Sequence, residues 1–186
     1  MNYLKTIMNV GAILGLALVV PHIIFYLLGI TFEYYYTGLF IQFVVLLAGL
    51  IISGKYIRKE LFEEYVSYGK IFGASLLVLL FSSIIYSFYK FVLFSIIDPG
   101  LMNQYFEFVD NKILETQDNL LRLGMSEDKI EKMTMGLIDN MEQVKNETTP
   151  FTIAKSEIFN ITFWGGLLSL ITSIFIKREK SVFDTE

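Results

Sequence analysis

The sequence predicts an all-α, polytopic membrane protein with four transmembrane helices and an extramembrane helical hairpin between the third and the fourth. Three observations lead to this prediction. Four long segments contain almost no charge, and about 20 consecutive apolar residues are enough to cross a bilayer. Only 18% of the 186 residues are charged while 54% are apolar, whereas a soluble domain has about 25% charged residues. More than half of the 19 acidic residues fall in the single segment 98–150.

The expected spans are about 7–30, 37–53, 71–97 and 158–176, within a single membrane domain of residues 1–186. The first run is longer than the apolar core of a cleaved signal peptide, which has about 7–15 residues, so we expect it to be retained. Because the loop after it is short, we expect the second helix to run antiparallel beside the first. Residues 55–68 carry charges between apolar residues at near-helical spacing. This pattern fits either an interfacial helix or a solvated extension of the second span.

Segment 98–150 is predicted to form an αα-hairpin. Asp98 and Pro99 are residue types suited to the N-cap and the first helical position. Gly124 is suited to ending the first helix and Ser126 to capping the second. Thr149 and Pro150 repeat the cap-and-proline pattern at the start of the fourth span.

Each helix of the hairpin has an apolar stripe at helical spacing. The stripe residues are Met102, Phe106, Val109, Ile113 and Leu120 in the first helix, and Ile130, Met133, Leu137, Met141 and Val144 in the second. We expect the two stripes to pack on each other. This arrangement would leave the acidic outer face as the surface available to a partner.

Small residues occur at helix-packing spacing in all four spans, and they let helices approach closely in a membrane. These residues are Gly11, Gly15, Gly49, Ser53, Gly69, Gly73, Gly165 and Ser169. We expect them to pack helices within the chain, and homodimerisation through one such ridge is the alternative.

Three polar residues within the spans form a possible intramembrane site: His22, Gln42 and Lys90. Polar residues in spans are often functional. Each also has a structural interpretation. His22 follows Pro21 and could satisfy the carbonyl that the proline frees, Gln42 could bond between helices, and Lys90 could extend to the headgroups.

The basic residues near the ends of the spans predict the orientation, because Lys and Arg favour the cytoplasmic side. In a four-span arrangement they all fall on one side: Lys5, Lys55, Arg58, Lys59, Lys70, Lys177, Arg178 and Lys180. We therefore expect both termini in the cytoplasm and segment 98–150 outside, in a bacterial inner membrane.

Several classes of chemistry are excluded by the composition. The chain has no Cys and one His, which excludes disulfides, thiol catalysis, and a triad or multi-His metal site within one chain. P-loop, GxSxG, HExxH and GxGxxG motifs are absent. We expect no enzymatic activity, no cofactor and no metal. The net charge of −4 argues against nucleic-acid binding.

The order of several short motifs resembles that of an uncharacterised bacterial family of small four-span membrane proteins, a domain of unknown function. The motifs are Tyr68-Gly69, Phe72-Gly73, Asp98-Pro99, Gly124-Met125-Ser126-Glu127 and Lys177-Arg178. The resemblance covers nearly the whole chain. It implies four spans with a long helical insert before the last, and it implies no activity, ligand or catalytic residue.

Two functional hypotheses follow. In the first, the protein is a non-enzymatic structural or accessory protein of the lipid bilayer. Its acidic hairpin binds a second copy, or a membrane or periplasmic protein. In the second, it is an oligomeric small transporter or channel subunit organised around the intramembrane polar residues.

Overall fold

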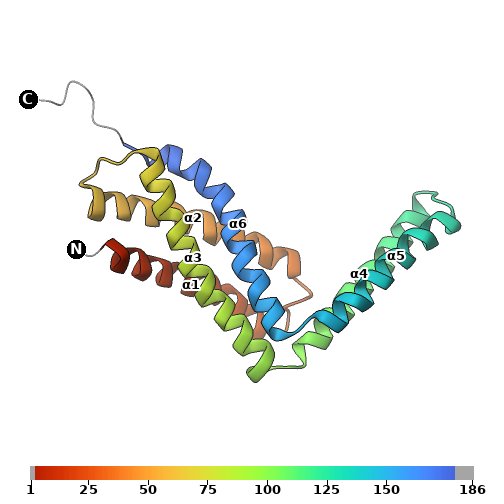
Figure 1. Ribbon diagram of the computed structural model, residues 1–186. Coiled ribbons are helices and arrows are strands. Elements are labelled where there is room, and N and C mark those ends of the chain that lie inside the picture. The colour runs from red at the N-terminus through yellow and green to blue at the C-terminus, as the bar shows by residue number, and fades with distance from the viewer. Residues whose placement is uncertain (1–2, 179–186) are drawn as a thin grey trace, which may run out of the picture. The chain divides into compact units, whose positions relative to one another are not determined.

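Helices make up nearly all of the chain that is described, residues 3–178 apart from the side chain of Asp139, in a computed structural model (Figure 1). Their order is α1 (Tyr3–Leu27), α2 (Tyr35–Phe62), α3 (Tyr68–Val92) with a π-helical turn (Leu93–Ile97), α4 (Leu101–Arg122), α5 (Glu127–Glu147) and α6 (Pro150–Ile176). Four of them are long and apolar enough to cross a membrane: α1, α2, α3 with its π turn, and α6. The predicted all-helical class, with four helices that could span a membrane, is therefore confirmed. Lys180, assigned above to the cytoplasmic side, lies outside the described residues.

The chain divides into two compact units. The membrane unit comprises residues 1–89 and 154–186, and the hairpin unit comprises Lys90–Ile153. The core of the membrane unit takes apolar side chains from all four of its helices. Fully buried examples are Ile7 and Leu18 of α1, Leu50 and Ile57 of α2, Ile71, Val78 and Leu79 of α3, and Ile176 of α6. Most of the other large apolar residues of these helices are exposed, as expected where the solvent is lipid.

One end of the membrane unit is held together by polar contacts. α2 continues without a break to Phe62, so residues 55–62 extend the second span. Glu63 and Glu64 then adopt positive φ angles of 49° and 72°, a left-handed conformation that ends the helix. Val66 next pairs with Arg178, through N–O distances of 2.8 and 3.1 Å. Arg58 of α2 also donates a hydrogen bond to the carbonyl of Ile176, at 2.9 Å. These bonds tie the α2–α3 loop to the end of α6.

The start of α4 differs from the prediction. Asp98 is extended, with φ −145° and ψ 82°, and its amide donates to the carbonyl of Leu93 at 2.8 Å. It therefore closes the π turn after α3, and α4 begins at Leu101 with Gly100 in the N-cap position. The assignment of Asp98 as N-cap and Pro99 as first helical residue was wrong by two residues. The preceding helix takes Asp98 as its own C-terminal residue.

The turn between α4 and α5 follows from Gly124, which has a φ of +81°. Its amide bonds to the carbonyl of Leu121 at 2.9 Å, and the amide of Met125 bonds to that of Leu120 at 3.1 Å. These two bonds define a Schellman motif. Ser126 then occupies the N-cap position of α5 in an extended conformation, without a side-chain cap bond.

α6 begins at Pro150, directly after Thr149. The hydroxyl of Thr149 accepts a bond from the amide of Thr152 at 3.2 Å, and the amide of Thr149 donates to the hydroxyl of Thr152 at 2.7 Å. This reciprocal pair works as a capping box does, with Thr in place of the usual Glu or Gln.

Candidate functional site

Small residues mark the close crossings in the membrane unit. A Cβ added to Gly11 would lie 2.7 Å from the Cβ of Phe81, and one added to Gly15 would lie 2.8 Å from the carbonyl oxygen of Ser82. The backbones of α1 and α3 therefore meet at these two glycines. At two other glycines, a side chain from a neighbouring helix occupies the space that a Cβ would take. Leu14 of α1 lies at Gly49, and Leu79 of α3 lies at Gly165.

Two predicted packing residues of α2 and α6 are polar and buried. Ser53 lies in α2, and the hydroxyl of Ser169 in α6 donates to the carbonyl of Gly166 at 2.9 Å. By contrast, a Cβ added to Gly69 or Gly73 would meet nothing within 4 Å. The ridge at the start of α3 thus packs no helix among the described residues, whereas the ridges of α1, α2 and α6 do.

His22 of α1 joins an aromatic cluster on α3. Its Nδ1 shares a hydrogen bond with the hydroxyl of Tyr89 at 2.9 Å. The imidazole also lies edge-on to Tyr89 and Tyr86, with ring centroids 5.5 and 6.4 Å away. Tyr86 is buried. The local sequence suggested a partner beside Pro21, but this bond reaches a different helix and ties α1 to α3.

The other two predicted polar positions have different surroundings. Gln42 is half-buried on α2. Lys90 belongs to the hairpin unit, where its ammonium lies 5.7 Å from the centroid of the Phe94 ring. Lys90 is buried, and the expectation that it extends to the headgroups stays a prediction.

A groove of about 520 Å³ runs between α1 and α2. Its α1 wall consists of Lys5, Thr6, Asn9, Val10 and Ile13, and its α2 wall of Ile52, Ser53 and Tyr56. Neither His22 nor Gln42 lines it. The volume falls within the range of small-molecule sites, about 300–1,000 Å³.

In the hairpin unit, the helix seam includes polar residues. Lys145 of α5 donates to Asp110 of α4 at 2.7 Å, and its ammonium lies 5.9 Å from the centroid of the Phe106 ring. Thr134 is buried, and its hydroxyl bonds back to the carbonyl of Ile130 at 2.6 Å. Lys145 and Thr134 lie on the α4-facing side of α5, where the sequence pattern had placed Val144 and Met133.

The face of α5 that contacts α4 is therefore rotated from the predicted one. Met133, Leu137 and Val144 are 54%, 47% and 45% exposed. Their spacings of four and seven residues place them on one line along the helix. Facing stripes were expected to hide all of these side chains from solvent, and that expectation was wrong for these three. We call this line the α5 stripe.

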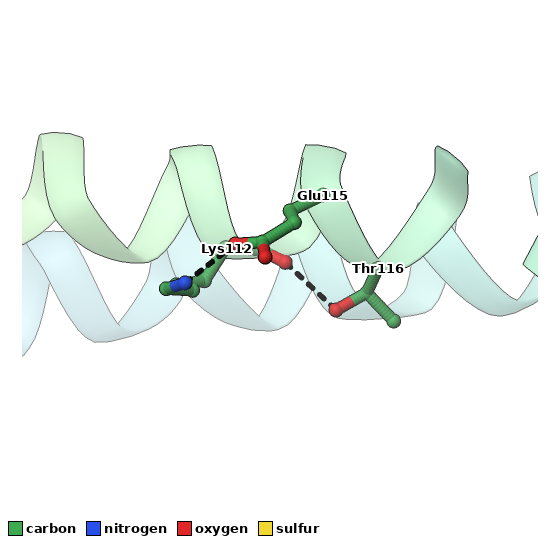
Figure 2. A network of polar contacts seen from close by, with 3 residues as sticks. All are labelled: Lys112, Glu115 and Thr116. Atoms are coloured by element: carbon green, nitrogen blue, oxygen red, sulfur yellow. Dashed lines mark hydrogen bonds and ion pairs between the residues drawn. The ribbon is translucent and has the colours of Figure 1, made fainter. Parts of the chain in front are cut away.

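One face of α4 is polar and exposed. Figure 2 shows Lys112 paired with Glu115, and the hydroxyl of Thr116 bonded to the carbonyl of Lys112. All three residues come from α4, and the ion pair is exposed. Such a pair contributes little to stability. Nothing in this network resembles a catalytic group or a ligand cradle.

Comparison with known protein families identifies the family to which this chain belongs. A family model described as a protein of unknown function, DUF4199, matches residues 9–178. The chain belongs to this family. The match runs from α1 through the hairpin unit to the end of α6, so the hairpin unit is part of the DUF4199 domain. No curated protein and no solved structure matches the chain.

Proposed function

We propose that this DUF4199 protein is a non-enzymatic accessory protein of the bacterial inner membrane that self-associates through its hairpin unit. The observation that carries the proposal is the α5 stripe. Most residues of α5 are polar. Of its five exposed large apolar residues, Met133, Leu137 and Val144 lie along one line, apart from Met135 and Ile138, and each of the three is about half exposed. Fully burying such a side chain stabilises by roughly 1.5–3 kcal/mol, so a partner would gain about half of that from each.

The charges beside the α5 stripe favour a second copy. Lys129 and Glu147 are both exposed and lie on the same flank of α5, 18 residues apart at its two ends. In an antiparallel pair of α5 helices centred on residue 138, Lys129 of each copy faces Glu147 of the other. A parallel pair instead sets Lys against Lys and Glu against Glu, which is unfavourable.

The middle of α5 suits a close approach. Gly136 is exposed, and a Cβ added there would meet nothing within 4 Å. Its counterpart across the centre at residue 138 is Asn140, which is exposed beside the stripe. In the antiparallel pair the side chain of Asn140 meets the glycine of the other copy, where there is no side chain to obstruct it.

Disulfide crosslinking tests this arrangement directly, because the chain has no native Cys. Single Cys variants of the full-length protein are oxidised in membranes and resolved as monomer and dimer. A disulfide forms only between Cβ atoms about 3.5–4.5 Å apart. We expect Leu137→Cys to dimerise, since it lies next to the centre of the pair. Met133→Cys and Val144→Cys should each remain monomeric alone and crosslink when the two variants are co-expressed.

Met135→Cys is the matched control, because Met135 is equally exposed but lies on the opposite face of α5. Self-crosslinking of all three stripe variants would indicate a parallel pair and contradict the charge argument. Crosslinking of Leu137→Cys at or below the level of Met135→Cys would overturn self-association through the stripe. The α5 stripe would then be expected to bind a different protein.

The orientation is part of the same proposal. The basic residues at the end of the membrane unit that holds Arg58 and Arg178 support cytoplasmic termini, with the hairpin unit on the outer side. A phosphatase inserted after Gly124 should be active, and a fluorescent protein that folds only in the cytoplasm should stay dark at the same position. The reverse pair of results would place the hairpin unit in the cytoplasm.

A further inference from the structure

The groove between α1 and α2 is polar at one end and apolar at the other. Lys5 and Asn9 come from the first turns of α1, and Tyr56 comes from the later part of α2. Val10, Ile13 and Ile52 form the rest of the wall. Between Lys5 and Ile13 the helix rises about 12 Å. The groove thus changes from cationic and hydrogen-bonding to hydrocarbon over the depth of a headgroup region and the first part of an acyl chain.

The groove faces outward from the membrane unit. Ile13 is 69% exposed and Ile52 is 68% exposed, and both belong to helices long enough to span a bilayer. Their side chains therefore border lipid hydrocarbon. Leu14, the residue after Ile13, fills the notch at Gly49, so the two helices are in contact beside the apolar end. A molecule entering from the bilayer finds a groove with a packed floor.

Within residues 3–178, no acidic side chain pairs with the charge at the polar end of the groove. Among residues 3–178, Lys5 has no ion pair, and its side chain is exposed. Lys55 and Lys59, on the same stretch of α2 as Tyr56, are exposed as well. None of the described residues that line this groove is acidic. A cationic end of this kind, with Tyr and Asn donors next to it, complements a phosphate group.

We propose that the α1–α2 groove binds one anionic glycerophospholipid. Its phosphate lies at Lys5, with Asn9 and Tyr56 as further hydrogen-bond donors, and one acyl chain follows Val10, Ile13 and Ile52. The groove complements both the phosphate and the acyl chain of this ligand. A soluble phosphate would leave the apolar length unfilled. The phosphate of a zwitterionic lipid is already balanced by the ammonium of its own headgroup, so an anionic lipid gains more from Lys5. This site is independent of the self-association proposed for the hairpin unit.

Native mass spectrometry of the full-length protein tests the site. The detergent-solubilised protein is incubated with equal amounts of phosphatidylglycerol and phosphatidylcholine, and the bound lipids are counted. We expect the wild type to retain phosphatidylglycerol preferentially. Lys5→Gln should lower its retention about fivefold, the effect of one cation near an anionic lipid. It should lower the retention of phosphatidylcholine less, because the choline ammonium already balances that phosphate. Ile13→Trp, which fills the apolar end, should lower the retention of both lipids.

Two matched controls separate the groove from general effects of charge and bulk. Lys70→Gln removes an exposed cation outside the groove, and Ile174→Trp adds the same bulk at an exposed position of α6. Both should retain phosphatidylglycerol as the wild type does. Equal losses in Lys5→Gln and Lys70→Gln would reduce the effect to surface charge and overturn the proposal. If both Ile13→Trp and Ile52→Trp retain the lipids as the wild type does, the proposed position of the acyl chain is wrong.

Discussion

Lys145 of α5 donates a hydrogen bond to Asp110 of α4 at 2.7 Å, inside the seam of the hairpin unit. Both side chains are partly shielded from solvent. The pair takes the place that an apolar contact of Val144 would have filled, and the lysine also lies above the ring of Phe106. Because the seam uses this ion pair, the neighbouring apolar line of α5 is left facing solvent. The exposed stripe and the ion pair are two results of one rotation of the helix.

The ion pair should be measurable as a coupling energy. Asp110→Asn, Lys145→Gln and the double variant form a cycle, read from hydrogen-exchange protection of α5 amides in the full-length protein. We expect a coupling of about 0.5–1 kcal/mol, the upper range for partly exposed pairs, and a decrease in high salt. The exposed Lys112–Glu115 pair serves as the reference, with a much smaller coupling. An equally small value for Asp110 and Lys145 would mean that the seam does not depend on this pair.

The two glycines of the hairpin unit should respond in opposite directions to alanine. Gly124 has a φ of +81°, and the left-handed conformation costs an L-residue about 1–2 kcal/mol. Gly136 lies within α5 with open space around it, so Ala there gains helix propensity of about 1 kcal/mol. In the detergent-solubilised monomer, amide exchange in α5 should therefore speed up in Gly124→Ala and slow down in Gly136→Ala. Acceleration in both variants would show that Gly136 packs within the hairpin unit itself, apart from its proposed contact with a second copy.

The sequence predicted those parts of the fold that depend on local physics. Four apolar runs became four helices long enough to span, because apolar length is the requirement for crossing a bilayer. Gly124 and Thr149 ended and began helices where expected, since their effect acts within a turn. The start of α4 was displaced because Asp98 served two helices at once, and the preceding π turn took it.

The contacts of the candidate sites could not be predicted in the same way. Thr134 turned inward because its hydroxyl bonds to its own helix and leaves a small apolar surface. Lys145 turned inward because Asp110, 35 residues away, accepts its charge. The partner of His22 is 67 residues away on α3. Helical periodicity indicates which face of a helix is apolar, and it carries no information on which distant polar group will meet a given side chain.

The His22–Tyr89 bond should stabilise the contact between α1 and α3 by a modest amount. Interhelical hydrogen bonds in membrane proteins average about 0.6 kcal/mol in double-variant cycles. His22→Phe, Tyr89→Phe and the double variant keep the ring contacts and remove the bond. We expect a coupling near that value from denaturant unfolding of the purified protein in detergent. A coupling energy near zero would mean that ring packing alone joins the two helices here, and that the hydrogen bond contributes no stability.

The close crossing of α1 and α3 should tolerate no side chain at Gly15. A Cβ there would lie 2.8 Å from the carbonyl oxygen of Ser82 and 2.9 Å from the Cβ of Ile85, and backbone atoms cannot move aside as a flexible side chain can. Gly15→Leu should lower the free energy of unfolding by about 3 kcal/mol, the upper range for overpacking. Gly73→Leu is the matched control, because a Cβ at Gly73 meets nothing within 4 Å. If Gly73→Leu destabilises the purified monomer as much as Gly15→Leu does, the effect at Gly15 does not arise from close packing between α1 and α3. If Gly73→Leu instead leaves the monomer intact, the cost at position 15 belongs to the helix crossing itself.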